Sequence, residues 1–279
     1  MKFWYVLIFA MLLFGCLEKK KEERTNRFKE ARQVVLEEIQ EIIDSSFVKG
    51  SVLVFDPQRN IYYSNDFEWA NQGKLPASTF KIPNSIIALE TGIIDSDSSI
   101  IKWDGEKRNV AIWEQDLSFH DAFQFSCVPC YQEIAREIGE NRMRKYLAKL
   151  EYGEMVFDSN SIDWFWLVGE SGISQFQQID FLERFYNGEL PISDRTETIM
   201  KKMMLIEKTD DYTLSGKTGW SYYKEIDNGW FVGYVNKNKE IYYFATNIEP
   251  QESLNMDLFP ALRKEITLEA LKIPGILKY

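Results

Sequence analysis

Two short groups of residues carry side chains suited to acyl transfer. Ser78 lies three residues before Lys81, so on a helix the two side chains would meet on one face. Near the other end of the chain is the run Lys217-Thr218-Gly219, which offers an ammonium and a hydroxyl on a predicted edge strand. A hydroxyl beside an amine is an activated nucleophile when the amine takes its proton, and the second group could hold a substrate carboxylate.

The spacing Ser-x-x-Lys is not specific by itself, because it occurs four times. The four pairs are Ser46/Lys49, Ser78/Lys81, Ser99/Lys102 and Ser221/Lys224. Only Ser78 opens an apolar run with helical spacing, which continues to Leu89 and ends at Gly92 as a helix stop. This pair, followed in order by Ser126-Cys127-Val128 and then by the Lys217 run, is the candidate nucleophile and base.

Lys81 can act as a base only if its amine is uncharged. At a reference pKa of about 10.4, roughly one lysine in 2,500 is neutral at pH 7. Burial lowers a lysine pKa by up to about 3–5 units, and Phe80, Ile82, Val128 and the apolar run 164–167 could supply the buried surroundings. A neutral, desolvated amine can also add carbon dioxide and become a carbamate, which is an acid–base group with the reach of a carboxylate.

Other catalytic arrangements lack the residues they need. His120 is the only histidine, and there is no Gly-x-Ser-x-Gly turn, which excludes a hydrolase triad and a two-histidine zinc site. Cys127 and Cys130 form a C-x-x-C motif, but the βαβ pattern of a redox protein and a fourth zinc ligand are both missing. We expect two small buried side chains near a helix start, with a disulfide left open.

The length and composition allow one large domain or two small ones, and they leave an anionic small molecule open as a substrate. Hydrophobic residues make up 45% of the 279 residues, enough for a packed core, and the formal net charge is −10. An acidic chain argues against nucleic acid as a partner, since phosphate neutralisation needs a basic face. No metal cofactor is expected.

The first residues predict export. Lys2 precedes an apolar run from Phe3 to Phe14, which is followed by Gly15-Cys16 and an abruptly charged stretch. This order is typical of a signal peptide at 1–16, with Cys16 as a lipidation site and 17–27 as a charged tether; an ordinary export signal cut nearby is the alternative. The predicted location is the periplasm or cell envelope, with membrane contact only through a lipid anchor.

Periodicity predicts a single α+β catalytic domain over 28–279. A helix is expected at 28–43, a hairpin from strands 51–55 and 61–64, and a final helix at 257–272. Six helices are expected between them, at 78–91, 118–126, 130–138, 141–150, 174–187 and 193–204, and three strands after them, at 212–218, 230–236 and 241–248. Strands at both ends predict one antiparallel sheet with an inserted helical lobe, and a site in the crevice between them.

The segments around these residues resemble the class D, oxacillin-hydrolysing serine β-lactamases over about residues 47 to 275. The matching segments are Pro76-Ala77-Ser78-Thr79-Phe80-Lys81-Ile82-Pro83-Asn84-Ser85, Ser126-Cys127-Val128-Pro129, Phe165-Trp166-Leu167, Gln178-Ile179-Asp180-Phe181-Leu182, Leu214-Ser215-Gly216-Lys217-Thr218-Gly219-Trp220, Gly229-Trp230-Phe231-Val232-Gly233 and Leu262-Arg263-Lys264. The resemblance implies a β-lactamase/transpeptidase-like fold and hydrolysis of β-lactam antibiotics.

The resemblance also implies roles for the nucleophile and its base. Ser78 would attack the lactam carbonyl, and Lys81, as N6-carboxylysine, would take the serine proton and later activate the deacylating water. Carbon dioxide or bicarbonate would be needed for that modification. Trp166 would hydrogen-bond the carbamate, while Val128 and Leu167 would flank it.

Further roles are implied for the substrate-facing residues. Ser126 would relay a proton to the departing lactam nitrogen beside Lys217. The backbone N–H groups of Ser78 and Trp220 would form the oxyanion hole. The substrate carboxylate would be held by the residues Thr218, Gly219 and Arg263.

One position departs from the family pattern, and two other functions stay open. The family usually has Tyr-Gly-Asn where this chain has Tyr152-Gly153-Glu154, which puts the substrate range in doubt. A β-lactam sensor would acylate without turnover, but such receptors normally carry several membrane helices. A penicillin-binding transpeptidase is disfavoured by Val128 and by the segment containing Trp166. Val110 and Tyr222 are expected at the rim of the site.

Overall fold

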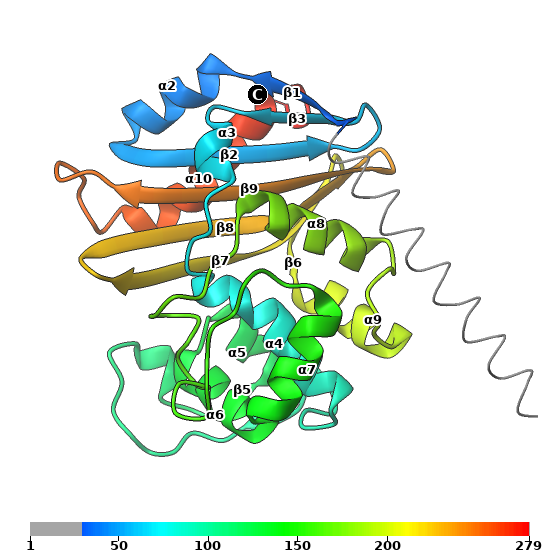
Figure 1. Cartoon of the computed structure of the whole chain (residues 1–279), viewed down its shortest axis with the longest axis vertical. Helices are drawn as coiled ribbons and strands as arrows, with labels where there is room; N and C mark the ends of the chain where they lie inside the picture. The colour runs from blue at the N-terminus through cyan, green and yellow to red at the C-terminus, as the bar shows by residue number, and fades with distance from the viewer. Residues whose placement is uncertain (1–29, 279) are drawn as a thin grey trace, which may run out of the picture.

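A seven-stranded sheet forms the centre of the computed structural model, which describes residues 30–278 (Figure 1). The strand order is β1-β3-β2-β9-β8-β7-β6. Their bounds are β1 (Arg32–Val35), β2 (Val48–Asp56), β3 (Ile61–Ser64), β6 (Leu205–Lys208), β7 (Thr213–Tyr223), β8 (Ile226–Lys237) and β9 (Glu240–Pro250). The two ends of the chain meet where β2 pairs antiparallel with β9, from Val48 opposite Pro250 to Phe55 opposite Tyr243. The expected sheet built from both ends is therefore present.

Helices from the two ends cover one face of the sheet. These are α2 (Glu37–Ser45) and α10 (Phe259–Lys272), whose apolar side chains pack on those of β2, β8 and β9. Ile39 and Ile43 lie on the buried stripe of α2, at the i and i+4 positions of one helix face.

The helical lobe lies at the β7 end of the sheet (Figure 1). Its elements are η1 (Ala77–Phe80), α4 (Lys81–Glu90), η2 (Ala111–Trp113), α5 (Phe119–Gln124), α6 (Val128–Ile138), α7 (Glu140–Leu150), α8 (Gln175–Tyr186) and α9 (Asp194–Met203), with a small sheet of β4 (Ile100–Ile101) and β5 (Leu117–Ser118). The short helix α3 (Phe67–Ala70) lies instead beside β2. Helix α8 also contacts the second face of the large sheet, on β8 and β9.

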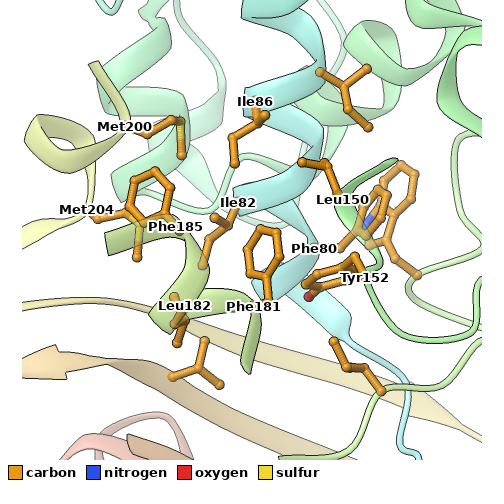
Figure 2. Close-up of a cluster of buried hydrophobic side chains, with 14 of the residues drawn as sticks. Phe80, Ile82, Ile86, Leu150, Tyr152, Phe181, Leu182, Phe185, Met200 and Met204 are labelled. Atoms are coloured by element: carbon orange, nitrogen blue, oxygen red, sulfur yellow. The ribbon is translucent and has the colours of Figure 1, made fainter. Parts of the chain in front are cut away.

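Helix α4 runs through the core of this lobe. Every residue from Lys81 to Leu89 is buried, a pattern that belongs to a helix packed on all sides. Figure 2 shows Ile82 and Ile86 of α4 pointing toward Phe185 of α8 and toward Met200 and Met204 at the end of α9. Lys81, the predicted base, is therefore the first residue of a helix that is buried in the core of the lobe.

The prediction of one helix over 28–43 was wrong in its first part. Residues 32–35 form β1, which pairs in parallel with β3, so that Arg32 lies opposite Ile61 and Val35 opposite Ser64. The β-branched pair Val34-Val35 suits this edge strand, and α2 begins only at Glu37. The sheet is consequently mixed at this edge and antiparallel elsewhere.

The other predicted elements occur with shifted ends. The helix expected from Ser78 begins as the 3₁₀ turn η1 and becomes α4 at Lys81, and the final helix starts at Phe259. The predicted signal peptide, Cys16 and the tether 17–27 lie outside the described residues. Within residues 30–278, no helix has both the length and the apolar content to cross a membrane.

Candidate active site

Ser78 and Lys81 meet where η1 passes into α4. Lys81 Nζ donates a hydrogen bond to Ser78 Oγ over 3.0 Å, the contact that a base and its nucleophile need. Ala77, just before the serine, has φ +51°, which is unfavourable for a residue with a Cβ, and its N–H donates to Trp166 O at 2.8 Å. The turn that presents Ser78 is thus held in a strained shape by the rest of the site.

The surroundings of Lys81 disfavour its charge. The side chain is 1% exposed, and Nζ lies 4.9 Å from the centre of the Tyr131 ring. Burial, and secondarily the nearby charge of Lys217, lowers the pKa of Lys81 well below its ordinary value. This lowered pKa favours the uncharged amine, which is the form that can act as a base.

Trp166 offers a buried donor beside this lysine's helix. Its ring stacks on Phe80 with centroids 5.2 Å apart, and Phe80 caps the start of α4. Its Nε1 is buried and has no hydrogen-bond partner among residues 30–278. An unpaired buried N–H is costly, so this atom is suited to an acceptor that is added to the protein. Val128 and Leu167, which are half-buried, belong to the same lobe.

Ser126 and Lys217 form a second hydroxyl–amine pair between the helical lobe and β7. Lys217 Nζ donates to Ser126 Oγ and, at 3.2 Å, to Thr218 O. Lys217 is 4% exposed, and burial, together with the charge of Arg263, lowers the pKa of Lys217 to about 7. This lysine can therefore exchange a proton near neutral pH, with Ser126 as the group in contact with it.

Within residues 30–278, strand β7, predicted as an edge strand, lacks a neighbouring strand on one side only in the segment that contains Lys217, Thr218 and Gly219. Strand β6 pairs with residues 213–215 of β7, and Gly216 N–H donates to Met204 O just before β6, whereas no strand pairs with residues 217–223 on that side in the described chain. There β7 borders the nucleophile turn, since a Cβ on Gly219 would lie 3.2 Å from both Ser78 N and Pro76 O. A glycine therefore suits this position, because a side chain there would crowd the turn that carries Ser78.

Arg263 reaches the same edge from α10. Its Nη1 donates to Gly219 O at 2.6 Å, and the side chain passes Gly229, where a Cβ would lie 3.0 Å from Arg263 Cδ. Burial lowers the pKa of Arg263 to about 10, which leaves it charged at neutral pH. Thr218, in the same strand, is half-buried.

The basic side chains of the site lack acidic partners. Within residues 30–278, no carboxylate forms an ion pair with Lys81, Lys217 or Arg263. Buried charges are normally paired, so Arg263 and protonated Lys217 are suited to an anionic ligand.

Two supporting networks escaped the sequence analysis. Gln178 Nε2 donates to Thr79 Oγ1 at 2.9 Å, and Tyr152 lies within 3.5 Å of both side chains. Leu75 O accepts from Asn228 Nδ2 and Trp230 Nε1, both at 2.8 Å. These bonds hold the chain on both sides of Ser78. The sequence hinted at them only through Gln178, a polar residue in one of the segments that resemble the class D family.

Cys127 and Cys130 form a disulfide, the pairing that the sequence left open, and only Cys127 is fully buried. Their Cα atoms are 5.4 Å apart across the first turn of α6, a spacing that the C-x-x-C motif allows on a helix. His120 is 3.2 Å from Asp121 and belongs to no metal cluster in the described chain.

Glu154 lies away from the catalytic pairs. Its backbone forms two hydrogen bonds of 2.8 Å with Gly172, and its exposed side chain lines a separate cavity of about 450 Å³ together with Glu170. Val110 and Tyr222, expected at the rim, are 38% and 62% exposed.

The fold and the segments match known proteins over most of the chain. Residues 48–266 match the penicillin binding protein transpeptidase domain. The chain is 40% identical over 226 residues to β-lactamase OXA-48 of Klebsiella pneumoniae, covering 81% of this chain and 85% of that protein. It is 42% identical to β-lactamase OXA-10 of Pseudomonas aeruginosa, covering 77% and 80%. The crystal structure of class D β-lactamase YbXI from Nostoc superimposes with a TM-score of 0.82 and 41% identity, covering 86% of this chain and 99% of that one.

Proposed function

The chain belongs to the class D serine β-lactamases, and from this premise we propose that it hydrolyses β-lactam antibiotics through an acyl-enzyme on Ser78. The observation that carries this assignment is the 3.0 Å contact between Ser78 Oγ and the buried amine of Lys81. Lys81, as a neutral amine or as a carbamate formed on that amine, would accept the serine proton as the oxygen attacks the lactam carbonyl.

We further propose that Lys81 carries a carbamate in the active enzyme. The fit rests on three observations: a buried amine whose pKa is lowered by that burial, the unpaired buried Nε1 of Trp166, and the lack of an ion pair between a carboxylate and Lys81, Lys217 or Arg263 in the described chain. Trp166 would donate to the carbamate, and the apolar side chains of Val128 and Leu167 would limit the access of water. When present, the carbamate supplies a general base with the reach of a carboxylate.

Ser126 and Lys217 are assigned to the departing nitrogen. Opening of the lactam requires a proton on that nitrogen, and a serine hydroxyl in contact with Lys217 can relay one. With a pKa of about 7, Lys217 can return to its protonated form between turnovers. The backbone N–H groups of Ser78 and Trp220 would stabilise the negative oxygen of the tetrahedral intermediate.

The substrate carboxylate is assigned to Arg263 and Thr218. Arg263 is charged and already oriented by Gly219 O, so the ordering of its side chain costs little when the substrate binds. Gly219 serves through its backbone, because any side chain there would press on the nucleophile turn.

A β-lactam sensor and a transpeptidase are both disfavoured as alternatives. The relatives at 40% and 42% identity, which this chain covers over most of their length, carry the name β-lactamase. We also propose that residues 1–16 direct export and that Cys16 is lipidated, which would place the enzyme in the periplasm or cell envelope.

Turnover of a chromogenic cephalosporin, with and without added bicarbonate, tests the proposal. We expect sustained hydrolysis that bicarbonate enhances, and loss of activity in acidic, CO2-depleted buffer that bicarbonate restores. A single stoichiometric burst in both conditions would instead indicate an acceptor that acylates without deacylation.

A further inference from the structure

The segment from Ser126 to Cys130 joins the end of α5 to the start of α6. Ser126, which contacts Lys217, stands immediately before Cys127, and the disulfide closes a ring over Cys127–Cys130. Cys127 is fully buried in the core of the lobe, whereas Cys130 is half-buried. The disulfide therefore anchors the residue that follows the proposed proton relay to the first turn of a packed helix.

Ser126 is held in a backbone conformation that a serine does not favour. Its φ is +53°, in the left-handed region, and such a residue persists only where its neighbours fix it. On the N-terminal side, Ser126 N–H donates to Phe123 O at 3.2 Å and Cys127 N–H donates to Ala122 O at 2.9 Å.

On the C-terminal side the constraint comes from the cysteines. Cys130 N–H donates to Cys127 Sγ at 3.2 Å, so Cys127 is the N-cap of α6. Pro129, the second residue of that helix, has no backbone N–H that would need a partner. The covalent bond and this cap together hold the strained Ser126 from one side.

We propose that the Cys127–Cys130 disulfide is a positioning device for Ser126, and that opening it slows the acylation of Ser78. This inference rests on the proposed role of Ser126 as the proton relay. In the oxidised enzyme Ser126 Oγ stays in contact with Lys217 Nζ. Once the ring is open, the Ser126 backbone can relax toward negative φ, which moves the hydroxyl away from that amine.

Opening the ring is a two-electron reduction. A dithiol donates two electrons and two protons, the Sγ–Sγ bond breaks, Cys127 and Cys130 become thiols, and the dithiol becomes a disulfide. The reduced and oxidised forms of the same chain would then differ in acylation rate and share the same substrate site.

The test compares the full chain with the double variant Cys127→Ala/Cys130→Ala. Single-turnover mixing with a chromogenic cephalosporin gives the acylation rate constant. We expect the acylation rate constant to fall about tenfold in the variant, which is the effect of losing one hydrogen bond to a charged group. We also expect that added bicarbonate does not restore the rate constant. A wild-type rate in the folded variant, or full rescue by bicarbonate, overturns the inference.

A reduction arm uses the unmodified chain. Dithiothreitol is added until thiol titration shows two new thiols relative to the untreated protein, and we expect the same tenfold loss, reversed on reoxidation. The double variant treated in the same way retains Cys16 and should show no change. If the wild type resists reduction or keeps its rate when reduced, the effect assigned to opening the ring is wrong.

A stability control separates positioning from general loosening. Met143→Ala removes a fully buried side chain of α7 from the same lobe core and should lower the melting temperature without slowing acylation. Equal slowing in Met143→Ala would assign the effect to stability and overturn the inference. Failure of the oxidised wild type to hydrolyse any β-lactam would instead contradict the proposed function.

Discussion

Two groups of lysines in this protein meet opposite electrostatic surroundings. Lys49 and Lys74 share Glu249 of β9, with one lysine Nζ on each carboxylate oxygen at 3.0 Å. Lys74 also lies 4.2 Å from the centre of the Trp69 ring. Lys81 and Lys217 are more deeply buried, yet in the described chain they contact hydroxyls, a carbonyl and aromatic rings, and no carboxylate.

The two groups differ in whether a carboxylate pairs with the lysines, and this difference bears on the pKa of Lys81 and of Lys217. Glu249 accepts an ion pair from each of the two lysines, and these pairs connect β9 with β2 and with the segment before η1. Burial lowers the pKa of Lys81 and of Lys217, and no carboxylate of the described chain pairs with either lysine to counteract that shift. A carboxylate within reach would stabilise the fold and abolish the base.

The sharpest test of this contrast replaces one lysine from each group. Lys81→Ala should lower kcat by about 10⁴-fold, because the nucleophile loses its base. Lys74→Ala should leave kcat within a few-fold and lower the free energy of unfolding by about 1–3 kcal/mol, since Glu249 stays buried with one partner fewer. Steady-state kinetics and urea unfolding of both variants decide it; normal turnover by Lys81→Ala would refute the assigned base.

Arg263 extends the comparison to the substrate. Arg263→Ala should raise KM for a β-lactam about 30–100-fold with a smaller change in kcat, the loss expected for a two-pronged contact between an arginine and a carboxylate. Arg263→Lys keeps the charge and should recover part of the loss. Unchanged KM in the alanine variant would remove Arg263 from the carboxylate site.

Two tryptophans provide a matched pair for the carbamate. Trp166→Phe removes an unpaired donor, whereas Trp230→Phe removes one that already bonds to Leu75 O at 2.8 Å. We expect the first to lower turnover about tenfold at ambient CO2, with rescue by bicarbonate. In the second, whose lost bond supports the turn before Ser78, we expect any loss of turnover to be independent of bicarbonate. Equal bicarbonate dependence in the two variants would contradict the role given to Trp166.

The smallest expected effect is the contribution of Lys217 to the pH dependence of stability. Because its folded pKa of about 7 lies below that of the unfolded chain, the unfolded state binds more protons above pH 7, and stability rises with pH. Between pH 7 and 8 this amounts to about 1 kcal/mol. Urea unfolding at the two pH values should show that gain in the wild type and lack it in Lys217→Met; an identical gain in both would contradict the lowered pKa.

The sequence predicted what depends on residue type and spacing. The contact of Ser78 with Lys81 follows from one helical turn, and the β7 edge follows from a strand that ends in small and polar residues. The class of fold also followed, from strands at both ends of the chain and helices between them.

What the sequence did not predict depends on partners distant in the chain. The short apolar run at 32–35 suits a helix or a strand equally, and only its pairing with β3 decides in favour of a strand. The left-handed backbone of Ala77 and Ser126 is a property of the packed site, since neither residue favours it. The disulfide likewise required the geometry of the first turn of α6.

The pairing of β2 with β9 also determines when this protein can become active. Residues 48–55 and 243–250 are neighbours in the central sheet although almost 200 residues separate them. A chain that grows from its N-terminus cannot complete that sheet, or bring Lys217 and Arg263 to Ser78, until nearly all of it has been synthesised. Such non-local topology folds slowly and late, so a truncated chain would carry the nucleophile without an active site.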